Sequence, residues 1–112
     1  MKGSMPDTIR LAHIIECIDN IELALQDVTF DDFFEDAIIR AAVVHWLTVV
    51  GEAARYVSEE TKNRYTDIEW KRMVGMRNVM VHRYFDIDYL AIWKATILLK
   101  DLKTKLKAIK LG

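Results

Sequence analysis

Apolar side chains recur at intervals of three and four residues through almost the whole chain, with few residues that would break a helix. The only proline is Pro6, and no stretch alternates between apolar and polar residues as a half-buried strand would. Short connections favour an antiparallel up-and-down bundle. The sequence therefore predicts an all-α fold, with four main helices over residues 7–26, 33–57, 70–84 and 90–109.

Short polar segments separate these predicted helices. Thr66 and Glu69 have the spacing of a capping box, which predicts that the third helix starts beside them. Either Asp86 or Asp88 is expected to cap the last helix, because an aspartate side chain accepts a hydrogen bond from the first free backbone N–H groups. The polar segment 58–65 has room for one helical turn.

The length and charge of the chain limit what it can do. Its 112 residues form one domain, of a size at which oligomerisation often adds stability, and Met5 is an alternative start to Met1, which leaves the origin of residues 1–4 open. Sixteen basic and 17 acidic residues give a formal net charge of −1, so contact with RNA needs a local basic surface.

Cysteine usage favours a reducing compartment. Cys17 is the only cysteine, and no group of Cys and His has the spacing of a zinc site, so the sequence predicts a cytoplasmic protein with no disulfide, metal or cofactor. Cys17 lies among isoleucines and is expected to be a small buried hydrophobe. The longest apolar runs are shorter than a membrane span, and no membrane association is expected.

One segment, residues 75–86, combines polar side chains that can do chemistry with apolar ones that can anchor them. It contains Arg77, Asn78, His82 and Tyr84. An Arg followed by four residues and a His is weak evidence alone, because the chain contains this spacing twice: His45 also follows an Arg in this way. His45, like His13, is expected to be an ordinary residue on a helix face.

The order Arg-Asn-x-x-x-His-x-Tyr-Phe resembles the signature of HEPN domains, most closely that of HepT-type toxins. Further similarity lies in Val50-Gly51-Glu52-Ala53-Ala54 and in residues 67–76, so the resemblance spans about residues 7–100. It implies a helical bundle that forms a homodimer, with two signatures facing one cleft. It also implies an endoribonuclease toxin of a type VII-like toxin–antitoxin pair, which a minimal nucleotidyltransferase antitoxin neutralises by AMPylation of Tyr84.

The residues themselves suit RNA cleavage without a metal. RNA supplies its own nucleophile, the 2′-hydroxyl, so cleavage needs proton transfer and positive charge at the phosphorus. His82 suits proton transfer, and Arg77 has a permanently charged planar fork for phosphate oxygens. Asn78 is expected to orient His82 or to donate to the phosphate. We therefore take Arg77 and His82 as candidate catalytic residues and Asn78 as a supporting one.

The spacing of the two candidates raises a geometric problem. On a regular helix, residues five apart such as Arg77 and His82 diverge by about 140°. Either the helix loosens around residues 81–84 or a second subunit completes the site. Glu52 is a further supporting candidate, because it could help to orient Arg77 or Asn78. The alternative is that it lies on a solvated or ion-paired face of its helix. Its neighbour Gly51 costs about 1 kcal/mol inside a helix, which predicts that another helix approaches it closely.

Other functions remain open at this stage. A noncatalytic module that docks and regulates a minimal nucleotidyltransferase is the main alternative to the ribonuclease. A nucleotide-binding domain is a weaker one, since no Gly-rich phosphate loop is present. The RNA target, tRNA or mRNA, is not specified. Six lysines of the last predicted helix are expected to form a solvated face, or else to hold an RNA backbone: Lys94, Lys100, Lys103, Lys105, Lys107 and Lys110.

Overall fold

A computed structural model describes residues 5–110, apart from the side chain of Tyr84, and all its regular structure is helical. Residues 1–4, where the alternative start falls, lie outside the described residues. The all-α prediction is confirmed. In chain order the elements are α1 (Asp7–Ala24), α2 (Phe30–Glu35), α3 (Ala37–Arg55), α4 (Glu59–Arg64), α5 (Trp70–His82), the 3₁₀ turn η2 (Tyr84–Asp86), α6 (Tyr89–Ile97) and α7 (Leu99–Lys107).

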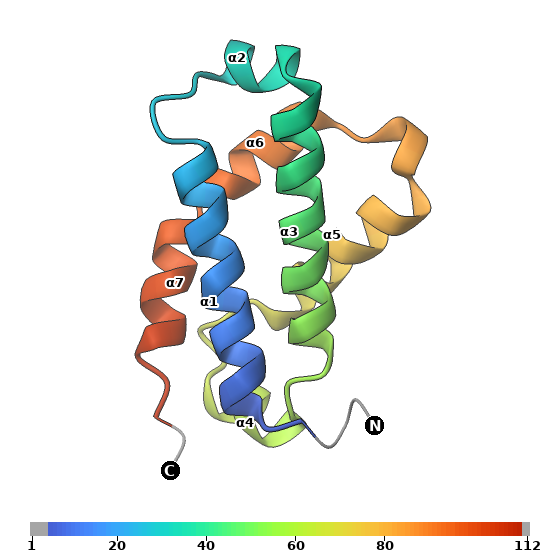
Figure 1. Ribbon diagram of the computed structural model, residues 1–112. Coiled ribbons are helices and arrows are strands. Elements are labelled where there is room, and N and C mark those ends of the chain that lie inside the picture. Colours follow the sequence, from blue (N-terminus) through green and yellow to red (C-terminus); the bar gives the residue numbers. More distant parts are fainter. Residues whose placement is uncertain (1–4, 111–112) are drawn as a thin grey trace.

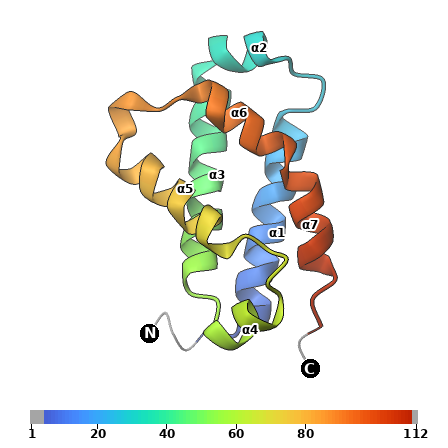
Figure 2. The ribbon, with the colours of Figure 1, turned by 180° about the vertical axis from the view of Figure 1, so that it is seen from behind.

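The long helices run alternately up and down. α1 and α3 lie side by side and antiparallel, and α7 returns along α1 (Figure 1). α5 crosses α3 obliquely, behind it in Figure 1 and in front of it in Figure 2. The short helices α2 and α4 occupy the two ends of the bundle. This arrangement leaves one side of α5 uncovered by the rest of the bundle.

Two of the four predicted helices are each divided in two. The helix expected over 33–57 is interrupted at Asp36, whose extended backbone (φ −101°, ψ 100°) ends α2 and whose carboxylate accepts from the N–H groups of Ile38 and Ile39 to begin α3. The helix expected over 90–109 is broken at Leu98, whose N–H bonds the carbonyl of Ala95 in a tighter turn. The sequence missed both breaks because apolar periodicity continues across them.

The predicted capping box at Thr66 and Glu69 is not formed. Glu69 itself occupies the position before α5, and its carboxylate instead pairs with the Arg72 guanidinium at 2.9 Å. A capping box occurs at α2, between Thr29 and Asp32. The cap of α6 at Asp88 and the helical turn within residues 58–65 are confirmed.

α3 is the central helix of the core. It packs against α1 on one side and α5 on the other, and its Val43, Leu47 and Ala54 are almost completely buried. By length and mean hydropathy α3 also reaches the minimum for a membrane span, which the sequence analysis did not expect. Part of its apolar surface is buried against α1 and α5, whereas Ile38 in its first turn is 82 % exposed.

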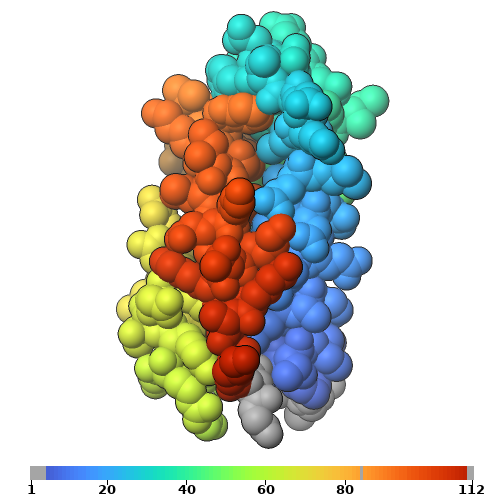
Figure 3. All heavy atoms as spheres, turned by 90° about the vertical axis from the view of Figure 1, so that its left-hand side faces the viewer, coloured from blue at the N-terminus to red at the C-terminus, as the bar shows by residue number. Residues whose placement is uncertain are grey.

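Two polar contacts fasten the outer helices to α1. Lys103 of α7 pairs with Asp19 at 3.0 Å and with Glu22, both on α1. Figure 3 shows α7 lying along α1. Lys103 is thus held by carboxylates, and its pKa is raised by the hydrogen bonds that it donates to Glu22 and Asp19.

The start of α1 is tied to the start of α4. Asp7 accepts hydrogen bonds from the Ser58 N–H (3.0 Å) and from the hydroxyls of Ser58 and Thr61 (2.6 Å each). Partial burial raises the pKa of the Asp7 carboxyl, but these hydrogen bonds outweigh it and hold the pKa below its usual value. This contact joins segments about fifty residues apart in the chain.

Candidate functional site

The site begins at the crossing of α3 and α5, where Gly51 allows the two backbones to come together. A Cβ atom on Gly51 would lie 2.2 Å from the Arg77 Cβ and 2.6 Å from the carbonyl oxygen of Met73. No side chain fits in that space. The close approach predicted from the glycine is therefore confirmed, and it brings the next residue, Glu52, to the side chain of Arg77.

Arg77 is held from two directions. Its Nε lies 3.0 Å from Oε2 of Glu52 in an ion pair, and its Nη1 donates to the side-chain oxygen of Asn78 at 3.1 Å. The Arg77 side chain is 22 % exposed, so it is mostly buried at the crossing of the two helices. Glu52 is therefore in an ion pair with Arg77.

His82 is the last residue of α5 and is exposed. The helix continues without a break from Arg77 to His82, and it ends only at Arg83 (φ −122°, ψ 37°). The helix expected to loosen around residues 81–84 does end there, but only after His82, so it is regular between the two candidate residues. Within one chain Arg77 and His82 point about 140° apart. Asn78, four residues before His82, shares its face of the helix and also contacts Arg77, so it lies between the two.

The chain leaves α5 through an exposed turn that contains Tyr84. Tyr84 begins η2, and its side chain lies outside the described part of the structure. Arg83 donates to the Asp86 carboxylate at 2.9 Å, across this turn. Phe85 is 99 % exposed. The turn therefore begins within two residues of His82, and the side chains of Arg83 and Phe85 in it are exposed.

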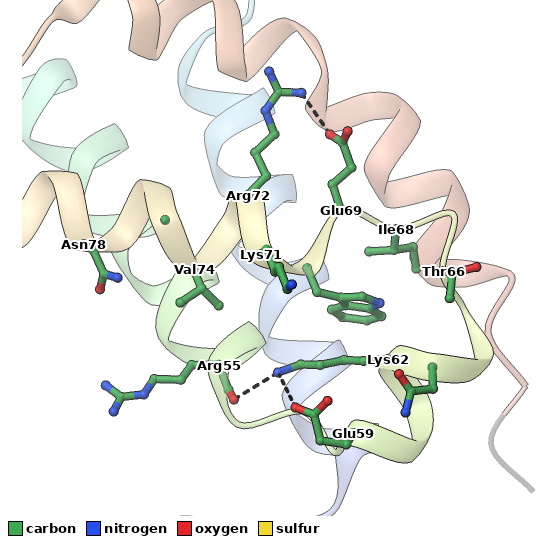
Figure 4. Close-up of a pocket in the computed structure, with 13 residues that line it drawn as sticks. Arg55, Glu59, Lys62, Thr66, Ile68, Glu69, Lys71, Arg72, Val74 and Asn78 are labelled. Atoms are coloured by element: carbon green, nitrogen blue, oxygen red, sulfur yellow. Dashed lines mark hydrogen bonds and ion pairs between the residues drawn. The ribbon is translucent and has the colours of Figure 1, made fainter.

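A pocket of about 760 Å³ adjoins the candidate site. It lies between the end of α3, the short helix α4 and the first turns of α5 (Figure 4). Asn78 and Arg55 lie toward one end in that view, and Thr66 and Ile68 toward the other. The pocket is lined by Arg55, Glu59, Lys62, Asn63, Thr66, Ile68, Glu69, Trp70, Lys71, Arg72, Val74, Gly75 and Asn78.

Lys71 and Gly75 line this pocket, although neither was a candidate from the sequence. A signal was present, because residues 71, 75, 78 and 82 follow one another at intervals of four, three and four and so share one face of α5. The apolar periodicity of α5 drew attention to the opposite, buried face, which carries Met73 and Met80.

The second Arg–His pair, His13 and the cysteine are ordinary packed or surface residues in the structure. Arg40, in the second copy of the Arg–His spacing, donates to the Phe34 carbonyl and stacks 5.1 Å above the Tyr89 ring. His13 and His45 are exposed on their helices. Burial raises the pKa of the Cys17 thiol, in keeping with its place in the core. Among the described residues, no group of three or more His, Cys, Asp or Glu side chains could hold a metal ion.

The sequence of this chain is similar to those of proteins named as ribonucleases. The family model described as "Ribonuclease HepT-like" matches residues 14–109. A protein of Methanocaldococcus jannaschii named "Putative RNase MJ1380" is 36% identical over 75% of this chain and 77% of its own length. The "Probable ribonuclease HepT" of Thermococcus cleftensis is 34% identical over 84% of each chain.

A third relative matches over a longer stretch. "Putative RNase TTE0752" of Caldanaerobacter subterraneus is 29% identical over 89% of this chain and 88% of its own. No solved structure matches the chain significantly. The family match includes α3, α5 and η2, and so covers every residue of the candidate site.

Proposed function

The chain belongs to the family of HepT-like ribonucleases, and from this premise we propose that it is a metal-independent endoribonuclease that acts on cytoplasmic RNA. One observation carries the proposal: α5 presents a guanidinium that is fixed by Glu52 and Asn78 together with an exposed imidazole, His82, at the end of the same helix. These are the charged group and the proton-transfer group that cleavage of RNA requires.

The reaction follows from the chemistry of RNA. The 2′-oxygen attacks the adjacent phosphorus, the bond from phosphorus to the 5′-oxygen breaks, and the products are a 2′,3′-cyclic phosphate and a 5′-hydroxyl. One imidazole takes the proton of the 2′-hydroxyl, and another gives a proton to the leaving 5′-oxygen. Arg77 contacts the phosphate oxygens, on which negative charge builds up in the transition state.

The two proton transfers come from different chains. A single chain supplies one His82, and its unbroken α5 turns that side chain away from Arg77. A homodimer with the two α5 helices facing one cleft would bring His82 and the partner's His82 to the same phosphate, as base and acid. Support comes from the exposure of His82 and Asn78, which share one face of α5.

The proposal is tested by cleavage of a mixed pool of tRNA and mRNA in EDTA. Wild-type protein is expected to cut and to leave 2′,3′-cyclic phosphate ends, while Arg77→Ala and His82→Ala lose the activity. Exposed Arg64 on α4 offers a matched control, since Arg64→Ala also removes a positive charge and should leave cleavage unchanged. Undiminished cutting by His82→Ala would refute the assignment.

We further propose that the ribonuclease is the toxin of a toxin–antitoxin pair and is silenced by a minimal nucleotidyltransferase. The Tyr84 phenol would attack the α-phosphorus of ATP on that enzyme, pyrophosphate would leave, and the phenol proton would pass to solvent. The attached AMP brings a negative phosphate within two residues of His82, where it repels and displaces substrate phosphate. The position of Tyr84 in an exposed turn directly after α5 supports this.

Modification is tested with the partner enzyme and ATP. Tyr84→Phe should keep its ribonuclease activity and resist neutralisation, while mass spectrometry finds AMP on the wild-type peptide. Full neutralisation with an unmodified Tyr84 would exclude this route. If protein that is unmodified at Tyr84 fails to cut RNA, a noncatalytic module that docks and regulates the nucleotidyltransferase becomes the better interpretation.

A further inference from the structure

The two glycines of the crossing helices differ in what surrounds them. At Gly51 the backbone of α5 fills the place of a side chain, whereas a Cβ atom on Gly75 would meet nothing within 4 Å. A glycine in the middle of a helix costs about 1 kcal/mol relative to alanine. Because the chain itself does not use the space beside Gly75, that space is open to a bound molecule in the pocket that Gly75 lines.

Gly75 lies in the middle of a polar stripe on α5. Lys71, Gly75, Asn78 and His82 follow one another at intervals of four, three and four residues, so the stripe runs along one face of the helix for about 16 Å. Lys71, Asn78 and His82 are all exposed. The stripe thus connects the candidate catalytic histidine with the pocket, and the missing side chain at Gly75 leaves the way between them unobstructed.

The charges along this pocket favour an anion. Two of its acidic residues are paired locally: Glu69 with Arg72 at 2.9 Å, and Glu59 with Lys62 at 3.9 Å. No ion pair with either Lys71 or Arg55 is found in the part of the chain that the structure describes. In Figure 4 Lys71 projects from α5 on the side of α4, and the Arg55 side chain extends outward from the end of α3, at the end of the pocket where Asn78 also lies.

We propose that this pocket is a subsite for the sugar–phosphate backbone of the RNA strand beside the scissile bond. Lys71 and Arg55 contact phosphates of the strand, and its backbone lies against α5 at Gly75. The subsite deepens the ribonuclease proposal and rests on it. The overall charge of the protein is close to neutral, so RNA binding needs a local basic surface. Lys71 and Arg55, whose guanidinium lies 5.4 Å from the centre of the Tyr56 ring, supply two positive charges along this pocket.

Binding is measured with His82→Ala protein, which holds RNA without cutting it, and a short fluorescent single-stranded RNA over a series of salt concentrations. Lys71→Ala should weaken binding by roughly fivefold to tenfold. It should also lower the slope of log affinity against log salt by about 0.7, which is the value for one lost phosphate contact on a single strand. Arg55→Ala should act similarly. Arg64→Ala, which removes an exposed charge on α4 outside the pocket lining, should change neither quantity.

Gly75 provides a test that does not involve charge. Gly75→Leu should fold, because leucine favours helices and the space beside it is open, yet it should weaken RNA binding by obstructing the stripe. Thermal unfolding of the same variant verifies the fold. Gly75→Ala, with a much smaller side chain, should have a smaller effect on binding.

The possible results separate the two proposals. If RNA is cut by wild type and bound by His82→Ala, but the Lys71 and Gly75 variants bind as the parent does, the subsite is wrong and the ribonuclease stands. If wild type neither cuts nor binds RNA, both are overturned. A third result is that Gly75→Leu changes the mass of the assembly in solution, while the Lys71 variant has the same salt slope as its parent. The polar stripe on α5 is then a contact between copies of the chain, and the subsite is excluded.

Discussion

The Nε of Arg77 lies 3.0 Å from Oε2 of Glu52, directly beside the closest approach of α3 and α5. Gly51 sets that approach, because only a residue without a side chain fits between the helices. The next residue then faces the guanidinium. Two adjacent residues of one helix thus position the proposed catalytic arginine of the other, one through the backbone and one through charge.

Gly51→Ala should destabilise the protein. Its methyl group would overlap the Arg77 Cβ, 2.2 Å away, and the helices would have to separate. Overpacking of this kind costs roughly 1 to 3 kcal/mol, and urea unfolding measures it. Gly75→Ala is the matched control: its methyl group meets nothing, and the helix propensity of alanine should raise the free energy of unfolding by up to about 1 kcal/mol. Equal effects of the two substitutions would contradict this account of the crossing.

Glu52→Gln should reduce RNA cleavage much more than it reduces stability. The amide keeps the shape of the side chain but loses the charge that holds Arg77, and a catalytic group displaced by about 1 Å can cost 100-fold in rate. The ion pair is partly exposed, so its loss should lower the free energy of unfolding by about 1 kcal/mol or less. Single-turnover rates at saturating RNA measure the first effect. An unchanged rate would show that Glu52 only stabilises the fold.

Mixed dimers should reveal whether both chains serve one phosphate. Wild-type and His82→Ala chains are unfolded together, refolded at different ratios and assayed for cleavage. If each cleavage needs His82 from both subunits, only wild-type homodimers are active, and an equal mixture retains about one quarter of the activity. Independent sites would retain about one half. A linear dependence on the wild-type fraction would therefore exclude the shared site.

The contact between Asp7 and α4 should make stability depend on acid pH. The pKa of Asp7 is lowered in the folded protein, so its contribution is fully present above the pKa of the unfolded chain and is lost as the pH falls through the lower, folded value. Asp7→Ala should lower the free energy of unfolding by roughly 2 kcal/mol near neutral pH, through lost hydrogen bonds to a charged group. Urea unfolding from neutral to acid pH should show the two proteins converging. A constant difference would contradict the role of the charged carboxylate.

Particular residues show how far sequence reasoning reached. The spacing of apolar residues predicted the helical class, and Gly51 predicted a close helix crossing. The start of α6 was narrowed to Asp86 or Asp88, and the structure has it at Asp88. The capping box at Thr66 failed because Glu69 pairs with Arg72, a competing partner that the pattern does not reveal. The break at Asp36 was missed because the aspartate ends one helix and caps the next while the apolar stripe continues.

The order of residues by itself determined that α5 carries Arg77, Asn78 and His82, and that the first and last of these diverge on a regular helix. It did so because helical geometry depends only on local spacing. Tertiary structure alone decided that Glu52 is the partner of Arg77, and that Lys71, Gly75 and Arg55 border one pocket. Those residues come together through the angle and distance at which α3 and α5 cross, and that crossing depends on how side chains from the whole core pack.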